Sequence, residues 1–248
     1  MKATITHKKQ TFSVDLLQPI DISIPLSDTE NPGAWYIEKP TIIPVQSEDW
    51  IGKVSEGGDV NFNTITFNPH AHGTHTECVG HITEKVHSIN KHLTQFFFVA
   101  ELITVVSEAS GDDLVISKKQ LKHALNGKNP EALVIRTIPN THKKKTKNWS
   151  HTNWTYIEES AMVFLRESGV KHLLIDLPSV DREKDEGELK AHKAFWDVDG
   201  TIRMDATITE MIYVPHKIED GRYLLNLQIA PFENDATPSK PVLYKMES

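Results

Sequence analysis

Short apolar runs, separated by turn-forming residues, divide the chain into predicted β-strands. The runs at 96–106 (FFFVAELITVV) and 132–138 (ALVIRTI) are rich in β-branched and aromatic residues, which favour buried strands. The stretch at 60–67 (VNFNTITF) has the same character and leads directly into a cluster of histidines. Further strands are predicted at 16–26, 172–177, 211–215, 223–231 and 242–246.

Other segments carry apolar residues at helical spacing, and helices are predicted at 117–126, 155–168 and 182–196. Ser117 is a suitable N-cap for the first helix. In the second, Thr155 and Glu158 form a capping-box pattern and Gly169 marks the end. Helices thus alternate with strands in the middle of the chain, and strands dominate both ends. We therefore expect one domain spanning residues 1–248, of the α/β or α+β class, with a mixed β-sheet and flanking helices.

Charge and cysteine usage narrow the function classes. The 248 residues have a formal net charge of −7, which argues against nucleic acid as a partner, and the basic run at 142–147 (HKKKTK) is interpreted as a solvated loop. The apolar run at 96–106 is too short to span a bilayer and contains Glu101, so no membrane partner is expected. With the single cysteine Cys78 and no signal-peptide core near the N-terminus, we expect a cytoplasmic location.

The stretch from His70 to His81 (HAHGTHTECVGH) concentrates possible metal ligands. It offers four imidazoles and one carboxylate: His70, His72, His75, Glu77 and His81. A lone histidine is more often an ordinary surface or core residue, but four with a carboxylate in twelve residues are much rarer. Imidazole and carboxylate groups are common ligands of zinc and manganese, and such an ion can generate a bound hydroxide near neutral pH. The sequence therefore predicts a divalent-metal site.

The same stretch carries a family resemblance. The segment Gly73-Thr74-His75-x-Glu77-x-x-x-His81 resembles the signature of the cyclase-like metal-dependent hydrolases, which include bacterial kynurenine formamidases and isatin hydrolases. Their usual pattern is His-x-Gly-Thr-His-x-Asp-x-x-x-His. Further similar pieces follow in the expected order: PIDIS at 19–23, ALVIRT at 132–137, DLPSVD at 176–181, His192 and Glu210. The resemblance extends over nearly the whole chain.

This resemblance implies an α/β fold of the swivelling β/α/β type with a centre of one or two metal ions, zinc or manganese. It implies that His75 and Glu77 are ligands, that His192 and Glu210 are ligands of a second ion, and that His81 is the general acid/base. The implied reaction is hydrolysis of a C–N bond in an amide, formamide or cyclic amide. The implied partners are a small-molecule substrate and further copies of the chain, in a dimer or tetramer.

Three positions depart from the family pattern. Ala71 occupies the place of the leading histidine, so that either His70 or His72 must substitute; we favour His70 because Pro69 restrains its backbone. Glu77 replaces the usual aspartate, which moves the carboxylate by about 1.5 Å, one single-bond length. Cys78 replaces a usual alanine and is expected to face the core. These departures motivate an alternative function, a non-catalytic metal- or ligand-binding protein on the same scaffold.

Some residues outside the cluster have two interpretations. Trp35 and Tyr36 follow a Pro-Gly turn and match the region that contributes to the substrate pocket in the family, or they serve packing. Arg136 binds a substrate carboxylate or holds a loop. Asp181 positions a histidine or closes a structural ion pair.

Overall fold

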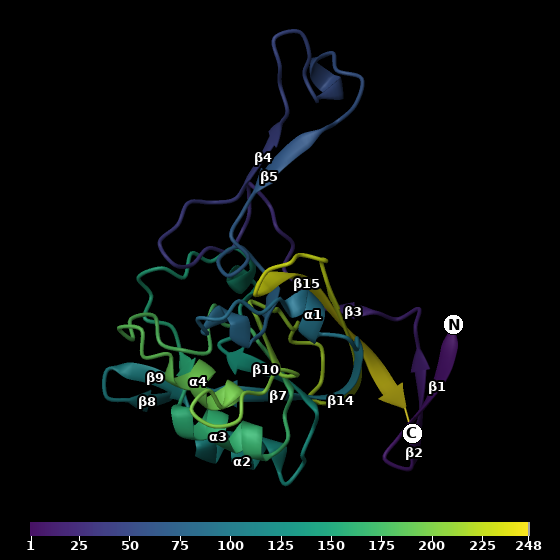
Figure 1. Cartoon of the computed structure of the whole chain (residues 1–248). Helices are drawn as coiled ribbons and strands as arrows, with labels where there is room; N and C mark the ends of the chain where they lie inside the picture. The colour runs from purple at the N-terminus through teal and green to yellow at the C-terminus, as the bar shows by residue number, and fades with distance from the viewer. Residues whose placement is uncertain (248) are drawn as a thin grey trace.

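The computed structural model describes residues 1–247, and its main feature is a ten-stranded mixed sheet (Figure 1). Seven strands close into a barrel in the order β15-β14-β7-β10-β12-β13-β6, because β6 pairs with both β13 and β15. Their bounds are β6 His75–Glu77, β7 Phe97–Val106, β10 Ala132–Ile138, β12 His172–Ile175, β13 Thr207–Glu210, β14 Gly221–Ile229 and β15 Ala236–Glu247. The predicted α/β class with a mixed sheet is confirmed, and the barrel closure is a feature that the sequence analysis did not anticipate.

Three more strands extend this sheet beyond the barrel: β1 (Lys2–His7), β2 (Gln10–Asp15) and β3 (Ile20–Asp21). Smaller elements lie outside it: β4 Thr41–Pro44 with β5 Asn63–Thr66, and β8 Glu108–Ser110, β9 Asp113–Ile116 and β11 Tyr156–Ile157. The α-helices are α1 Ile89–His92, α2 Lys118–Leu125, α3 Glu159–Glu167 and α4 Lys190–Trp196, and the 3-10 turns are η1 Val54–Glu56, η2 Val79–His81 and η3 His142–Lys145. No helix within residues 1–247 has the length and apolar character needed to cross a bilayer.

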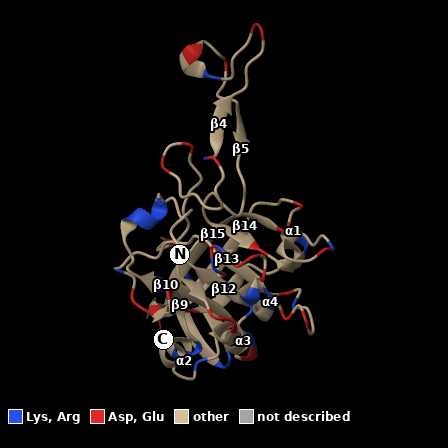
Figure 2. Ribbon diagram, turned by 90° about the vertical axis from the view of Figure 1, so that its left-hand side faces the viewer, with Lys and Arg blue, Asp and Glu red and all other residues tan. Residues whose placement is uncertain are grey.

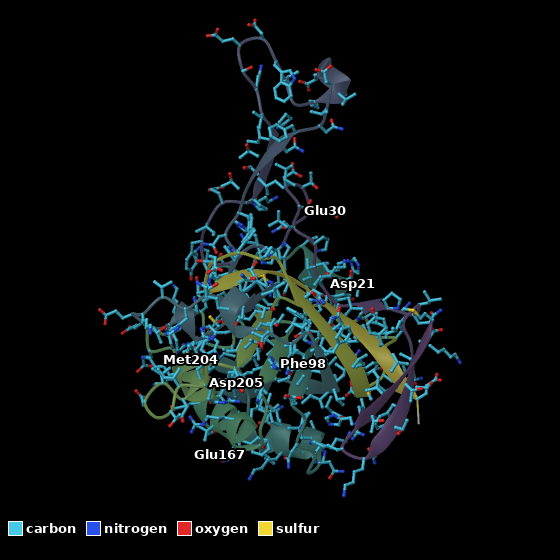
Figure 3. All side chains as sticks on the ribbon, turned by 45° about the vertical axis from the view of Figure 1, so that its right-hand side comes forward. Asp21, Glu30, Phe98, Glu167, Met204 and Asp205 are labelled. Atoms are coloured by element: carbon cyan, nitrogen blue, oxygen red, sulfur yellow. The ribbon has the colours of Figure 1, made fainter. Side chains whose placement is uncertain are left out.

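Two apolar clusters lie on opposite faces of the barrel strands. Along β10, Leu133 and Ile135 pack against the helical layer of α2, α3 and α4, whereas Val134 packs with residues such as Leu102 and Leu225 on the other face. This separation follows from the two-residue period of a strand. Figure 3 shows the side chains that fill the barrel region, where Phe98 of β7 contacts the ring of His172. The barrel is therefore a rigid support for the loops at its rim.

Several predicted elements are confirmed. The strand at 132–138 has the predicted bounds, and the strands predicted at 96–106, 172–177, 223–231 and 242–246 overlap β7, β12, β14 and β15. Helix α2 begins after Ser117, whose hydroxyl accepts the backbone N–H of Gln120 in a capping box. These elements have strong local signals and bury one face in the sheet or helical layer.

Other predicted elements are wrong in extent or type. Residues Tyr156–Ile157 form strand β11 rather than the first turn of a helix, and the Thr155 hydroxyl bonds to Ser107, so the predicted capping box does not form. The helix predicted at 182–196 is helical only over α4, because the Asp185 carboxylate accepts two backbone N–H groups and fixes a loop before it. At 211–215 no strand forms, and the neighbouring segment Thr207–Glu210 is the barrel strand instead.

The strand predicted at 60–67 also has a different position from the one expected. Its ordered part, β5, does not belong to the barrel but pairs with β4 in a hairpin that projects far from the body (Figures 1 and 2). The histidine cluster is partly a strand, since His75 to Glu77 form β6. The predicted strand at 16–26 is reduced to Ile20–Asp21. The hairpin β1–β2 was not predicted, because its exposed, alternating polar positions give little apolar signal.

Candidate metal centre

Strand β6 places two candidate ligands at the centre of a buried cluster. His75 and Glu77 are two residues apart and therefore project from the same face of the strand. Glu210 on β13 is paired with His75 in the antiparallel register, which places its Oε2 atom 3.4 Å from Nε2 of His75. Both residues of β6 are fully buried, so the barrel closure that joins β6 to β13 and β15 builds this part of the centre.

Helix α4 adds His192 from the opposite side. Its Nε2 atom lies 3.0 Å from Oε1 of Glu77 and 3.8 Å from Oε1 of Glu210. Its Nδ1 atom donates to Oδ2 of Asp181 at 2.5 Å, and Asp181 also accepts the backbone N–H groups of Ala191 and His192. Asp181 therefore orients the histidine. We call His75, Glu77, His192 and Glu210 the inner group.

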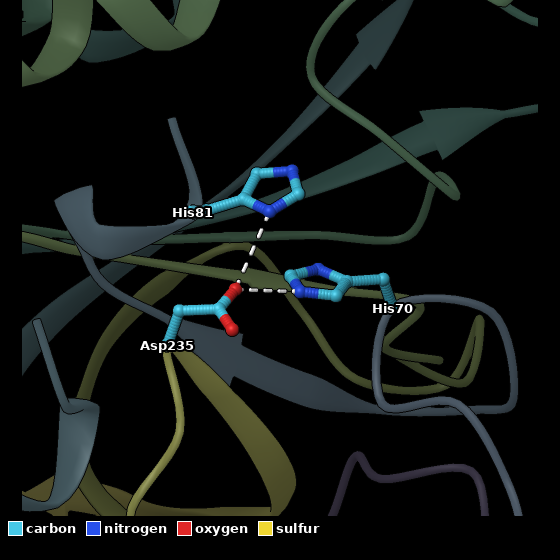
Figure 4. A group of neighbouring side chains, drawn as sticks. All are labelled: His70, His81 and Asp235. Atoms are coloured by element: carbon cyan, nitrogen blue, oxygen red, sulfur yellow. Dashed lines mark hydrogen bonds and ion pairs between the residues drawn. The ribbon is translucent and has the colours of Figure 1, made fainter. Parts of the chain in front are cut away.

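A second set of side chains, His70, His81 and Asp235, gathers around the Asp235 carboxylate (Figure 4). Oδ2 of Asp235 is 2.8 Å from Nε2 of His70 and 3.4 Å from Nδ1 of His81. His70 also approaches the inner group, because its Nδ1 atom is 3.1 Å from Oε2 of Glu77. The side chain of His81 is 31% exposed and that of Asp235 is 22% exposed, so solvent reaches this side. We call His70, His81 and Asp235 the outer group.

The ring nitrogens of the histidines are arranged as metal ligands usually are. His75 donates Nδ1–H to the carbonyl of Gly73, which leaves the Nε2 lone pair facing the Glu210 carboxylate. His192 and His70 likewise use one nitrogen on an aspartate and turn the other toward Glu77. Within residues 1–247, Nε2 of His75 and Oε2 of Glu77 have no hydrogen-bond partner although both are buried. A lone pair facing a carboxylate requires a proton or a cation between them.

The donor set fits a divalent cation. Three groups of donor atoms lie within 4.8 Å of one another: His70, His75 and Glu77; Glu77, His81 and His192; and His70, His81 and Asp235. Glu77 belongs to two of these groups. Nitrogen and oxygen donors suit a zinc- or manganese-type ion, and a group of three donors is one fewer than the four ligands that a zinc ion usually takes. The residues present therefore support a divalent-metal site.

Protonation of the metal-free cluster reflects the contacts between its histidines and the neighbouring carboxylates. Burial opposes a charge on His70, but its contacts with Asp235 and Glu77 outweigh burial and raise the pKa of His70 to about 10. The pKa of His192 is also raised despite its burial, because Asp181 and Glu77 stabilise the charged ring. Burial would raise the pKa of Glu77, yet the surrounding histidines lower it well below its usual value. Protons thus occupy positions that a cation would take.

The structure distinguishes His70 from His72. The Nδ1 atom of His72 accepts the backbone N–H of Asn68, and its Nε2 atom donates to the carbonyl of Glu38. Both ring nitrogens are therefore used in backbone contacts outside the cluster, whereas His70 is inside it. Gly73 allows the chain to turn here with a φ of 106°, and a Cβ atom at this position would lie 3.1 Å from the carbonyl oxygen of Ile24.

Cys78 and Arg136 are both buried, and neither contributes to the metal centre. Cys78 lies in the core, and burial raises the pKa of its thiol to about 11, as expected for an inert residue. Arg136 does not project into the metal centre. Its guanidinium donates to the carbonyls of Pro215 and Ile218, to the Asp220 carboxylate and to the Thr104 hydroxyl. Of the two interpretations of Arg136, loop holding is the one that its contacts support.

Trp35 and Tyr36 lie in a loop that packs against the segment 149–154. Both residues have a positive φ, near 60°, and the Trp35 ring meets Trp154 edge-on at 5.0 Å. The hydroxyl of Tyr36 donates to Glu183 at 2.8 Å, and the ring is about half exposed. The Tyr36 phenol is thus held in place while its ring remains accessible, as a pocket wall requires, whereas Trp35 packs against the apolar core.

Asp235 is the cluster residue that sequence reasoning missed. It lies in a short polar turn (FENDATP, 232–238) with no histidine or motif nearby. Its position results from the register of β15 against β6, in which Ala236 pairs with Glu77. A local sequence signal would not have identified it, because the contact depends on closure of the barrel.

Comparison with known proteins gives a consistent pattern. A family model described as "Putative cyclase" matches residues 20–182. The chain is 25% identical over 231 residues to kynurenine formamidase of Bacillus cereus (strain ATCC 10987 / NRS 248), covering 93% of this chain and 96% of that protein. Kynurenine formamidase of Bacillus anthracis is 28% identical over 226 residues, with 90% and 96% covered.

Two solved structures show the same fold at low sequence identity. A predicted metal-dependent hydrolase from Bacillus stearothermophilus superposes with a TM-score of 0.65 and 16% identity, over 92% of this chain and 98% of that one. An isatin hydrolase bound to the product analogue thioisatinate superposes with a TM-score of 0.63 and 13% identity, over 92% of each chain. The barrel and its rim are therefore shared across sequences that differ widely.

Proposed function

The chain belongs to the family described as "Putative cyclase", and from this premise we propose that it is a metal-dependent hydrolase of a C–N bond in an amide, formamide or cyclic amide. The observation that carries the proposal is the arrangement of His70, His75 and His192, each of which directs one ring nitrogen at a shared carboxylate pair. The relatives that are kynurenine formamidases support the same reaction class.

We infer that the metal ligands are His70, His75, Glu77, His192 and Glu210, with Asp235 beside them. They would hold one or two divalent ions, zinc or manganese, in agreement with their donor atoms. Such an ion, when bound, supplies an electrophile for the carbonyl oxygen and acidifies a water molecule. Asp181 and the Gly73 carbonyl orient the imidazoles from outside, which raises their basicity as ligands.

His81 is the proposed general acid/base. Its ring is accessible to solvent, and its Nε2 atom lies 3.9 Å from Oε2 of Glu77, at the edge of the cluster rather than within it. Asp235 contacts the other ring nitrogen and fixes the ring orientation. In this position His81 takes the proton from the attacking water and returns it to the leaving nitrogen. The exposure of His81 and Asp235 favours an open reactive site over a closed non-catalytic one.

Trp35 and Tyr36 form a wall for a small planar substrate, held by the contact of Tyr36 with Glu183. Residues 1–248 act as one hydrolase domain of the swivelling β/α/β type, assembled as a dimer or tetramer. The single, buried cysteine fits a reducing compartment, and we place the protein in the cytoplasm.

The test is a metal and activity measurement on purified protein. Metal content is determined by elemental analysis, and hydrolysis is assayed with formanilide-type and isatin-type substrates before and after chelation. The His81→Ala variant serves as the matched control, because it should retain metal while losing turnover by about a hundredfold or more. Full turnover in that variant would exclude the role of His81, and metal without hydrolysis of any amide would exclude the enzyme.

A further inference from the structure

Lys147 carries a partly buried charge that no carboxylate of residues 1–247 neutralises in an ion pair. It ends the basic segment 142–147, whose turn η3 is the blue segment at one side of the body in Figure 2. The Nζ atom of Lys147 lies 3.9 Å from the centre of the Trp149 ring. Burial lowers the pKa of Lys147, and the nearby charge of Lys144 lowers it further. An anion that approaches from outside the chain would stabilise a cation in this setting.

The basic segment is anchored at the end of the barrel that carries the metal centre. The Nζ atom of Lys144 donates to Oδ2 of Asp176 at 2.8 Å and to the hydroxyl of Thr137 at 2.7 Å. These acceptors lie at the C-terminal ends of β12 and β10, and Glu210 ends β13, which is parallel to β12. Because parallel strands end on the same side of a sheet, Lys147 belongs to a segment fixed on the rim that holds the inner group.

Backbone contacts place Lys147 next to the loop of Tyr36. The carbonyl of Lys147 accepts the N–H of Gly33 at 3.1 Å, and the N–H of Trp149 donates to the carbonyl of Gly33 at 2.7 Å. Three residues after Gly33, the N–H of Tyr36 donates to the hydroxyl of Ser150 at 3.0 Å. The two segments therefore run side by side, and a molecule bound against the exposed Tyr36 ring has Lys147 beside it.

The carboxylate that stabilises the Lys147 charge from within the chain is Glu183, and its oxygens are already engaged. They accept the hydroxyl of Tyr36 at 2.8 Å and the backbone N–H groups of His151 and Asn153. Burial would raise the pKa of Glu183, but these contacts lower it below its usual value. Glu183 thus holds the loops around Tyr36 in place, and it forms no ion pair with Lys147.

We propose that Lys147 binds an anionic group of the substrate, so that the substrate is an aromatic amide with a carboxylate. The ring lies against Tyr36, the carboxylate meets the Lys147 ammonium, and the amide faces the metal centre. Arg136, the other cation considered for a substrate carboxylate, is occupied by the loop at 215–220. Lys147 is then a specificity-determining residue that acts on substrate binding. This inference rests on the proposed function, because it names the substrate class of the same site.

The kinetic test compares formanilide with the three formamidobenzoates, which carry a carboxylate ortho, meta or para to the formamide. For at least one of them, the wild-type KM should be about tenfold or more below that of formanilide. Lys147→Met keeps the alkyl chain over Trp149 but removes the charge. It should raise that KM about tenfold or more, while kcat and the KM of formanilide stay within about twofold. Lys147→Arg should keep the low KM to within about threefold.

Lys143→Met is the matched control for the loss of charge. Lys143 is an exposed lysine of the same segment, so this variant changes the net charge equally and should leave all four KM values within about twofold. Circular dichroism spectra and metal content should be unchanged in every variant. The proposal is overturned if the wild type prefers none of the carboxylated substrates, or if Lys147→Met raises the KM of neutral and anionic substrates equally. An equal effect of Lys143→Met would also overturn it.

A binding measurement separates this inference from hydrolysis. Calorimetric titration of the purified, metal-containing protein with benzoate and with benzamide requires no turnover. Benzoate should bind at least about tenfold more tightly to the wild type than to Lys147→Met, and benzamide equally to both. Benzoate held by the metal alone would bind both proteins equally and would reject the role of Lys147. If the tenfold difference is found but no amide is hydrolysed, the hydrolase is rejected while the anion site stands.

Discussion

The inner and outer groups of the metal centre use the same kinds of side chain, but the fold holds them differently. The inner group is buried on strands β6 and β13 and on helix α4, and contacts with the Gly73 carbonyl and with Asp181 fix its two histidine rings. His70 lies in a loop and His81 is the last residue of the 3-10 turn η2, and Asp235 contacts both histidines. The inner group is therefore suited to holding a cation in fixed geometry, and the outer group to exchanging protons and ligands with solvent.

Glu77 contacts residues of both groups, so substituting it should disrupt metal binding by the inner group and by the outer group together. The Glu77→Gln variant keeps the size of the side chain but removes the charge shared by His70 and His192. Bound metal should fall below about a tenth of an equivalent, and turnover should fall at least about a hundredfold, which is more than the loss of a residue that only orients a metal ligand causes. Glu77→Asp is the matched control, since it keeps the charge. Metal analysis showing full occupancy in Glu77→Gln would contradict this account.

Support of the inner group is tested at Asp181. The Asp181→Asn variant weakens the contact that orients His192 and fixes its ring tautomer. Metal affinity should fall by about 10–100-fold, as for other residues that orient metal-binding histidines. Titration with a chelator of known affinity measures it. The same substitution at Asp235 should change metal affinity less and turnover more. Equal losses of affinity in both variants would remove the distinction between the two groups.

The outer group should give the metal-free protein an unusual dependence on pH. Because the pKa of His70 is raised to about 10, its contribution to stability is present below its ordinary value near 6.5 and is lost as pH rises through 10. The unfolding temperature without metal should therefore fall from pH 7 to pH 10, by an amount worth a few kcal/mol at most, given about 1.4 kcal/mol per pKa unit.

The Asp235→Asn variant separates this effect from other groups that titrate near pH 10. It removes one of the two carboxylates that hold the proton on His70, so the fall should be smaller than in the wild type. With metal bound, histidine ligands are deprotonated, and rising pH should favour binding instead. Calorimetric scans at matched pH, with and without chelator, compare the two states. Parallel pH curves for wild type and variant would refute the assignment.

Sequence reasoning was most effective where the signal is local. The β-branched run at 132–138 and the Ser117 cap determined β10 and the start of α2, because burial and capping depend on adjacent residues. The segment at 155–168 was misjudged because Thr155 and Glu158 satisfy the capping pattern, while pairing of Tyr156–Ile157 with β9 prevails over it. A tertiary contact of this kind leaves no trace in a local pattern.

The metal centre shows the same limit. His75, Glu77 and His81 are close in sequence and were predicted from their spacing, while His192 and Glu210 came only through the family resemblance. All five lie in the cluster, although their roles as ligands or acid/base are still predictions. Asp235 was missed because its place depends on which strand closes the barrel, a property of the whole chain.

The smallest effect is expected at His72, which belongs to the histidine-rich segment 70–81 but lies outside the metal cluster. The His72→Ala variant removes two hydrogen bonds at the base of the β4–β5 hairpin and no donor from the centre. The carbonyl of Glu38 and the N–H of Asn68 belong to exposed residues and can bond to water, so the loss should be about 1 kcal/mol. That corresponds to a fall of roughly 2–4 °C in the unfolding temperature of a chain of this size.

Metal content and turnover of His72→Ala should stay within about twofold of wild type, whereas His70→Ala should lose most of its metal. Elemental analysis of the two variants, purified side by side, measures this difference. The two histidines are two positions apart in sequence, but His70 is a proposed ligand and His72 bonds only to backbone groups. Loss of metal in His72→Ala with full retention in His70→Ala would reverse the assignment. It would also show that the backbone contacts of His72 are exchanged when metal binds, so that the β4–β5 hairpin and the outer group would move together.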